Sequence, residues 1–514
     1  MKKTLALLIA CTLIFSLFAG CSSKETAKPV TDASSTPTVA AEVPTIKLTI
    51  PTLYSVPSTE NTEATAKVLN EYLDSKGYQF HVALEIMGPM DYFTQPFMAL
   101  AGGEEMDVWM PFDGSDQALL NCVNNGYLLP IDEYLDKELA DTMALDSIDK
   151  LMPICTLNGV TYQIPAMKGF TLAYSFLYNK EIAAELNLDM DSVKTISDLD
   201  AIFAAVKAAY PEMTVVGNVG NDSVGLDVGL GTDKYYQVMD ICAGVTVSEG
   251  STKAENYFRS QAFLDAVNTA YAWSQAGYTD PNSSANSEQT SIEENLFYNG
   301  QIFSMFGLYS NKPENVSAML TNSYGRELGC IPLGNTCNAT MVPSLGIAYT
   351  TKHPSECAQL INLMMTDPVV VNTVFYGVEG KDYVWATDDT VAYPEGVNMS
   401  TMEYGLGTIN GMYGNQFITY PHVEGTHADD LEYMKELTNN ATFSPLFGFT
   451  FDPSNVSSNM SAIANVIGQY RDALRYGDVD PETYLPQFWA ALDEAGINDV
   501  IAEAQTQIDA YLAK

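Results

Sequence analysis

The chain has 514 residues and a formal net charge of −40, from 64 acidic and 24 basic side chains. Such an acidic surface repels nucleic acid and anionic lipid, so neither is expected as a partner. It could attract cationic solutes, but we interpret the charge as a source of solubility. The length exceeds one ordinary core and predicts at least two lobes, while eight cysteines are too few for a disulfide scaffold.

The first 44 residues predict export. Residues 1–20 contain a basic start, an uncharged apolar run from Leu5 to Phe18 and two small residues. The run is shorter than the ~20 residues of a membrane-crossing helix, which indicates a cleaved signal peptide. Because Cys21 follows directly, the segment resembles a bacterial lipoprotein signal and implies lipidation of Cys21, including palmitate. The alternative is an ordinary signal peptide followed by an incidental cysteine. Residues 21–44 are rich in Ser, Thr, Ala and Pro and are expected to form a disordered tether.

Strand and helix patterns alternate from residue 45 onward. Strands are predicted over residues 46–50, 80–86, 107–110, 214–219 and 301–306. Helices are predicted over residues 63–75, 91–101, 182–186, 199–209, 262–275, from 313, 354–365, 461–476, 481–492 and 499–512. The first three strands and their connecting helices indicate a parallel sheet. Ligands bind at the carboxyl ends of such strands, which directs attention to Pro111–Ser115.

Motifs for catalysis or metal binding are missing from the sequence. Its four histidines form no HExxH motif, no phosphate-binding GxxxxGK[ST] loop occurs, and Gly220–Gly225 is one residue longer than a nucleophile elbow. No CxxC pair is present, which makes a structural zinc site improbable. With all of these motifs missing, neither a metal site nor a cofactor is expected. Cys330 and Cys337 could close a small disulfide loop, or remain buried free thiols.

Aromatic side chains are abundant in loops that also carry amides and carboxylates, and the chain has 30 tyrosines. An aromatic ring beside polar groups suits a sugar, whose C–H face stacks while its hydroxyls form hydrogen bonds. Packing within the core is the alternative role for any one of these rings.

Several motifs resemble the extracellular solute-binding proteins of ABC importers. They are Gly159–Pro165, Phe176–Lys180, Ser197–Asp200, the helix that begins at His353-Pro354, and Tyr376–Tyr383. Ser444–Asp452 and Gly477–Pro481 are similar to a Gram-positive lipoprotein branch of carbohydrate-type binding proteins that carries a C-terminal domain of unknown function. The resemblance implies an α/β fold: a two-lobed type II periplasmic-binding-protein clamshell with a helical C-terminal region. It places residues 45–168 and 328–375 in the N-lobe, and residues 169–327 and 376–514 in the C-lobe.

The resemblance also implies a set of ligand-binding residues between the lobes. The loop after the third strand contributes an aromatic and polar contacts, and the first chain crossing, the returning strand and the next crossover contribute the others. These residues are Phe112, Asp113, Ser115, Thr171, Tyr174, Tyr309, Asn311, Glu379 and Trp385. Several sugar binders of the family carry tryptophan in the first of these loops, where this chain has Phe112.

These inferences predict a monomeric, lipid-anchored receptor on the outer face of the cell membrane. It would bind a small solute, most simply a sugar or oligosaccharide, and deliver it to ABC permease subunits without catalysing a reaction. Two alternatives remain: a surface lipoprotein glycosidase, and a sensory binding protein for a non-sugar ligand.

Overall fold

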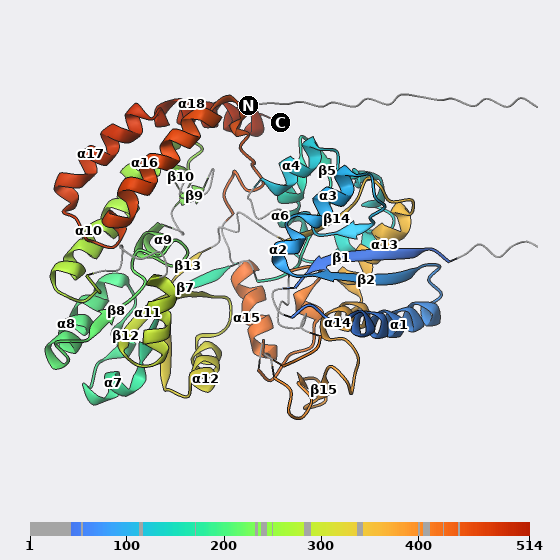
Figure 1. The fold of residues 1–514 in the computed structure, drawn as a ribbon, viewed down its shortest axis with the longest axis horizontal. Helices are drawn as coiled ribbons and strands as arrows, with labels where there is room; N and C mark the ends of the chain where they lie inside the picture. The colour runs from blue at the N-terminus through green and yellow to red at the C-terminus, as the bar shows by residue number, and fades with distance from the viewer. Residues whose placement is uncertain are drawn as a thin grey trace, which may run out of the picture. The chain divides into compact units, whose positions relative to one another are not determined.

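A computed structural model describes residues 43–52, 55–112, 117–169, 171–231, 235–237, 244–248, 250–281, 289–336, 343–398, 401–404, 412–424, 426–439 and 443–513. Residues 43–514 form one compact unit (Figure 1). The predicted signal peptide and tether, including Cys21, lie outside the described residues. Within the described part of the chain, no helix has the length and apolarity needed to span a bilayer.

The first lobe is built on a five-stranded sheet with the order β2-β1-β3-β14-β6. Its strands are β1 (Thr45–Pro51), β2 (His81–Met87), β3 (Val108–Trp109), β14 (Ser344–Ile347) and β6 (Gln163–Pro165). Strands β1, β2 and β3 are parallel, as predicted, and β14 runs antiparallel to both β3 and β6. Strand β6 is therefore parallel to β3, and the carboxyl ends of four strands share one edge of the sheet.

Helix α1 (Thr59–Lys76) shows how local sequence determines the ends of an element. The Ser58 hydroxyl accepts a hydrogen bond from the Asn61 amide at its start. The helix stops at Gly77, whose φ of 84° is in the left-handed region that glycine adopts without strain. Leu69 and Leu73 are buried in the core of the first lobe.

The helix predicted over residues 91–101 is two helices, α2 (Pro89–Tyr92) and α3 (Gln95–Ala101). The prediction was wrong at this point because Pro96 lies in the first turn of α3, where its ring has no preceding helical turn to clash with. Tyr92 at the end of α2 is fully buried; its hydroxyl donates to the Met110 carbonyl at 2.8 Å and lies 3.1 Å from the Thr49 carbonyl. This bond ties the helix break to the carboxyl ends of β1 and β3.

The remaining elements of the first lobe cover its sheet and extend it. They are α4 (Ala118–Asn124), η1 (Asp132–Tyr134), α5 (Ala140–Met143), α6 (Ile148–Leu151), η2 (Met152–Cys155), β4 (Thr156–Leu157), β5 (Val160–Thr161), α13 (Pro354–Thr366), α14 (Pro368–Tyr376), β15 (Val384–Trp385), β16 (Val391–Ala392) and η9 (Gln416–Ile418). One large apolar core joins β1, α1, α13 and α14.

The second lobe is built on a four-stranded sheet with the order β13-β7-β12-β8. Its strands are β7 (Leu172–Asn179), β8 (Thr214–Val216), β12 (Ile302–Tyr309) and β13 (Leu328–Thr336). Its helices are α7 (Lys180–Glu185), η3 (Met190–Ser192), η4 (Ile196–Asp198), α8 (Leu199–Ala209), α9 (Leu226–Gly231), η6 (Tyr257–Arg259), α10 (Gln261–Gln275), α11 (Gln289–Tyr298) and α12 (Pro313–Tyr324). Strand β7 is antiparallel to β12 and β13, whereas β8 is parallel to β12.

Helices α16 (Ser457–Arg475), α17 (Pro481–Glu494) and α18 (Ile497–Leu512) pack beside a small sheet of the second lobe (Figure 1). The sheet has the order β11-β10-β9 and consists of β9 (Tyr235–Gln237), β10 (Val245–Ser248) and β11 (Ala254–Asn256). The C-terminal elements are α15 (Ala428–Asn439), η10 (Pro453–Asn455), α16 (Ser457–Arg475), α17 (Pro481–Glu494) and α18 (Ile497–Leu512). A core of its own joins α16, α17 and α18 to Val245, Phe258 and Phe263.

The lobe boundaries differ from the predicted ones in two places. Residues 328–336 were predicted in the first lobe, but β13 is hydrogen-bonded to β7 and belongs to the second sheet. Residues from 376 onward were predicted in the second lobe, but Tyr376, Val391, Tyr404 and Tyr413 are buried in the core of the first. Chain crossings are set by long-range strand pairing, which local sequence does not encode.

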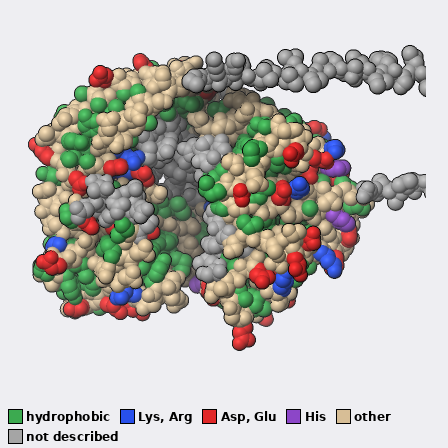
Figure 2. Space-filling view, viewed as in Figure 1, with side chains coloured by type: hydrophobic (Ala, Val, Ile, Leu, Met, Phe, Trp, Pro, Cys, Tyr) green, Lys and Arg blue, Asp and Glu red, His purple; other side chains and the backbone are tan. Residues whose placement is uncertain are grey.

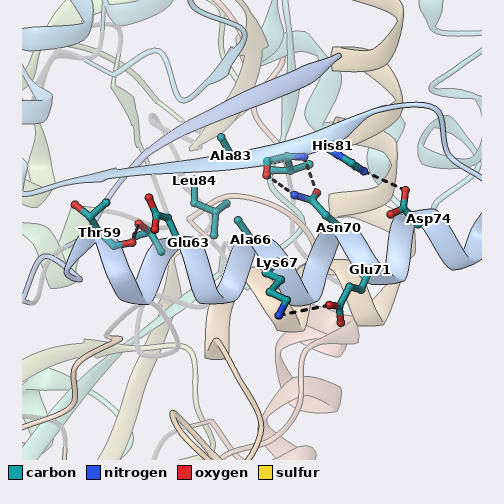
Figure 3. Close-up of a pocket in the computed structure, with 12 residues that line it drawn as sticks. Thr59, Glu63, Ala66, Lys67, Asn70, Glu71, Asp74, His81, Ala83 and Leu84 are labelled. Carbon is teal, nitrogen blue, oxygen red and sulfur yellow. Dashed lines mark hydrogen bonds and ion pairs between the residues drawn. The ribbon is translucent and has the colours of Figure 1, made fainter. Parts of the chain in front are cut away.

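A groove of about 560 Å³ runs along α1 and β2, the edge strand of the first sheet (Figure 3). Asn70 from α1 reaches the outer side of this strand. Its side-chain amide donates to the Val82 carbonyl at 3.0 Å, and its oxygen accepts from the Val82 amide at 2.7 Å. Asn70 therefore satisfies backbone groups that an edge strand leaves unpaired.

Candidate functional site

The chain crosses between the two sheets at the edges where solute sites form in open sheets. Strand β6 ends at Pro165 on the carboxyl edge of the first sheet, and β7 begins at Leu172. Because β7 is antiparallel to β12, Leu172 lies at the edge where β8 and β12 end. The return from β13 to β14 joins the same two edges. Both crossings therefore run along the carboxyl ends of the strands, as a site between the lobes requires.

Hydrogen bonds hold the first crossing in place. The Ala166 amide donates to the Pro343 carbonyl at 2.8 Å, so the outgoing and returning segments are paired. Met167 exchanges backbone bonds with Gly414 and Gln416. These bonds fix the path of the described residues at the start of the crossing.

Helix α15 lies beside this crossing. The Thr171 hydroxyl donates to the Leu437 carbonyl at 3.4 Å. A Cβ at Gly169 would come within 2.9 Å of Met434 Cγ, so a side chain at that position would displace the helix or the crossing. Sequence reasoning could not predict either contact, because both join segments that are far apart in the chain; 266 residues separate Thr171 from Leu437.

The structure places the predicted ligand residues in different environments. Phe112 is partly buried after β3 and packs edge-on against Phe93, with ring centroids 5.5 Å apart. Tyr309 and Asn311 are also partly buried, at and after the carboxyl end of β12. Thr171, at the start of the second sheet, is buried. Asp113 and Ser115 lie outside the described residues.

Tyr174 differs from these residues because its side chain belongs to the core. Only 1% of it is exposed, its ring stacks on Phe306, and burial raises the pKa of its hydroxyl. That hydroxyl contacts the carbonyls of Val224 and Gly225 at 3.1 and 3.2 Å. Tyr174 can therefore support a loop of the site more readily than it can contact a solute.

Glu379 and Trp385 lie in the first lobe, near the β15–β16 hairpin. Glu379 is exposed, and Trp385 is 39% exposed and packs on Tyr420 with centroids 4.7 Å apart. Tyr383 completes this group of rings. Tyr376, Tyr383 and Tyr420 pack with the core of the first lobe, so Glu379 and Trp385 do not lie at a chain crossover as expected.

Sequence reasoning missed Lys168, which lies in the first crossing. Its side chain is partly buried, and no ion pair or hydrogen bond joins its ammonium to another described residue. Burial lowers the pKa of this ammonium. A cation without a counter-ion at the edge of both sheets is an available donor for a solute hydroxyl or carboxylate. The available sequence signal was its position directly before the expected crossover.

Sequence reasoning also missed Asn218, which holds the loop after β8. Its amide exchanges two side-chain bonds with the Phe306 backbone, at 2.9 and 3.0 Å. Its own backbone amide donates to the buried Glu293 carboxylate at 2.6 Å. Its φ of 51° is in the left-handed region, which asparagine tolerates better than most residues.

One group of described residues has the spacing of a metal site. Ligand atoms of His427, Asp429 and Asp430 lie within 4.8 Å of one another at the start of α15. The Asp430 carboxylate already accepts the backbone amides of His427 and Lys312, and the Lys312 ammonium pairs with Asp429 at 3.0 Å. We therefore interpret this group as a helix cap that is neutralised by lysine.

The described cysteines are free thiols: Cys122, Cys155, Cys330 and Cys357. Cys330 is therefore not in a disulfide, and Cys337 lies outside the described residues.

Acidic side chains are spread over the visible surface with few basic ones among them (Figure 2).

Two open sheets joined by crossings at their carboxyl edges, with a helical C-terminal region, form the two-lobed α/β fold of extracellular solute-binding proteins. Residues 445–513 match a family model described as a domain of unknown function, DUF3502. A carbohydrate ABC transporter substrate-binding protein of Streptococcus pneumoniae serotype 4 is 24% identical over 456 residues, which cover 87% of this chain and 86% of that protein.

Solved structures show the same fold. The N-glycan transport solute-binding protein NgtS from Streptococcus pneumoniae aligns with a TM-score of 0.73 and 21% identity, over 92% of this chain and 99% of that one. The S. pneumoniae ABC-transporter substrate-binding protein FusA, in complex with kestose, aligns with a TM-score of 0.61 and 14% identity, over 91% and 99% of the two chains.

Proposed function

We propose that this protein is the lipid-anchored substrate-binding subunit of an ABC importer, and that it captures an oligosaccharide between its two lobes. The observation that carries the proposal is the meeting of both carboxyl edges at the chain crossings. Phe112, Lys168 and Tyr309 supply stacking faces and a charged donor at these edges. The likeness to carbohydrate-binding relatives over most of the chain supports the same solute class.

Capture of the solute follows from closure of the lobes. A solute that contacts both lobes binds the closed form more tightly than the open form and shifts the population toward closure. A solute with equal affinity for the two forms would bind without closing them. The closed form would then be the one that docks on the permease subunits, whose partner ATPases supply the energy. The protein itself would catalyse no reaction.

A thermal-shift screen tests the solute class. The chain from residue 21, with Cys21→Ser to prevent acylation, would be screened against oligosaccharides, monosaccharides, amino acids and polyamines. A solute at 100 times its dissociation constant should stabilise the folded state by about 2.7 kcal/mol. Stabilisation by oligosaccharides without hydrolysis would support the proposal. Hydrolysis of the added saccharide would instead establish a glycosidase, and stabilisation by amino acids or polyamines alone would exclude the sugar assignment.

Anchoring is tested separately. Wild-type protein should fractionate with membranes and incorporate labelled palmitate, whereas the Cys21→Ser variant should appear in the medium without label. Equal membrane association of the two proteins would show that Cys21 does not carry the anchor.

A further inference from the structure

The C-terminal region, residues 445–513, contacts the loop that leaves the carboxyl end of β8. This β8–α9 loop comprises residues 217–225 and contains the glycine-rich segment whose spacing did not fit a nucleophile elbow. Because it leaves the carboxyl edge of the second sheet, it lies at the edge of the candidate site.

Arg475, at the end of α16, is the principal contact. It is 3% exposed, and its Nη2 and Nε atoms lie 2.7 and 3.0 Å from one oxygen of Asp227, which is itself buried at the start of α9. Nη2 also donates to the Asn221 carbonyl at 2.6 Å, and Nη1 donates to Asp222. One guanidinium therefore fixes the middle of the loop and the helix that follows it.

The next residue closes the loop from the same side. A Cβ at Gly220 would come within 2.6 Å of the Tyr476 ring, so the backbone of the loop passes directly against that ring. On the other side of the loop, the Tyr174 hydroxyl contacts the carbonyls of Val224 and Gly225 at 3.1 and 3.2 Å. The loop is held between β7 of the second sheet and the end of α16.

Contacts other than those of Arg475 also join the C-terminal region to the second lobe. Arg259 pairs with Asp493 at 2.8 Å, and the Trp489 indole donates to the Phe258 carbonyl at 2.8 Å. A continuous apolar core joins the same surfaces. A buried ion pair adds little net stability, because the cost of removing both charges from water offsets their attraction. The contacts of Arg475 therefore account better for the shape of the loop than for attachment.

We propose that the C-terminal region sets the conformation of the β8–α9 loop through Arg475, which is a positioning residue for solute binding. The domain of unknown function thereby forms part of the apparatus that determines solute affinity. This inference rests on the proposed function for its binding consequence, whereas the control of loop conformation can be measured without any solute.

The test compares three variants of the full chain from residue 21. Arg475→Met removes the hydrogen bonds from the guanidinium to the β8–α9 loop and to Asp227. Arg475→Met with Asp227→Asn removes both buried charges, so that no unpaired charge is left to unfold the protein. Arg259→Met breaks an ion pair of the same region that does not touch the loop, and serves as the matched control. Amide hydrogen exchange of residues 217–231 without solute, thermal midpoints, and dissociation constants by calorimetry would be measured for each.

The double variant should fold with a midpoint near that of wild type. Exchange in the loop should be at least about tenfold faster, and the dissociation constant about 10- to 100-fold higher. Arg259→Met should change neither of these quantities. Wild-type exchange in the loop of the double variant would overturn the proposal, as would unchanged solute affinity. If wild type binds no saccharide, the proposed function fails, and the exchange measurement still decides whether Arg475 positions the loop.

Discussion

Lys168 gives the sharpest test of where the solute binds. Its ammonium lies in the first crossing with no bonded partner among the described residues, and burial lowers its pKa. Replacement by Met keeps the length of the side chain and removes the charged donor. A hydrogen bond from a charged group contributes about 1.5–3 kcal/mol, so Lys168→Met should raise the dissociation constant by about 10- to 150-fold.

The same substitution should not destabilise the free protein. An unpaired ammonium that has left water costs free energy, and Met fills the space without that cost. The thermal midpoint of Lys168→Met should therefore equal or exceed that of wild type. Weaker binding together with unchanged or higher stability would distinguish a solute contact from a packing role, in which both quantities would fall.

The effect on stability also has a predicted pH dependence. Because the pKa of Lys168 is lower in the folded state, the unfolded chain binds the extra proton between the folded value and about 10.5. Wild type should therefore gain stability relative to Lys168→Met as the pH rises through that window. Calorimetry measures the change in the dissociation constant, and thermal melts between pH 7 and pH 10.5 measure the pH dependence of stability. Lys67→Met is the control, since the Lys67 side chain is 77% exposed on α1. Unchanged affinity in Lys168→Met would refute this placement of the site.

Three further predictions follow from particular side chains. Phe112→Ala and Tyr309→Ala should each weaken solute binding by about 2- to 12-fold with little change in the thermal midpoint, and unchanged affinity in both would show that the site lies elsewhere. Burial lowers the pKa of His422 to about 4, so wild type should lose stability as the pH falls from about 6.5 through 4, by at most about 2 kcal/mol after solvent screening. His422→Asn should lose less over that range in acid denaturation, and parallel curves would contradict the assignment. Burial raises the pKa of Cys155 and Cys357 to about 12. Mass spectrometry should therefore find both thiols unmodified by iodoacetamide until the protein unfolds. Rapid labelling of these thiols in the native protein would contradict this prediction.

Elements with a strong local signal could be predicted from the sequence. The helix predicted over residues 199–209 is α8 (Leu199–Ala209), and α17 begins at the predicted Pro481. In both cases an apolar periodicity coincides with residues that suit a helix start. The three parallel strands of the first lobe were also recognisable, because each is separated from the next by a helical pattern.

The parts that were not predicted depend on contacts between distant segments. The short strands β9, β10 and β11 have no distinctive pattern, and β13 gives no local sign of the sheet to which it belongs. The burial of Tyr174 could not be inferred either, because Phe306 and the carbonyl of Val224, which enclose it, lie far along the chain. Lys168 was missed for a related reason, since its lack of a counter-ion is a property of the folded crossing.

The Asn70 side chain limits edge-to-edge pairing of β2 between copies of the protein at high local concentration. Copies held at high local concentration meet each other repeatedly, and a bare edge strand would let one sheet extend into the next. The paired bonds to the Val82 backbone occupy the register at which such an extension would begin. For the surface-anchored receptor proposed above, crowding would therefore not lead the first lobe of one copy to join that of a neighbour.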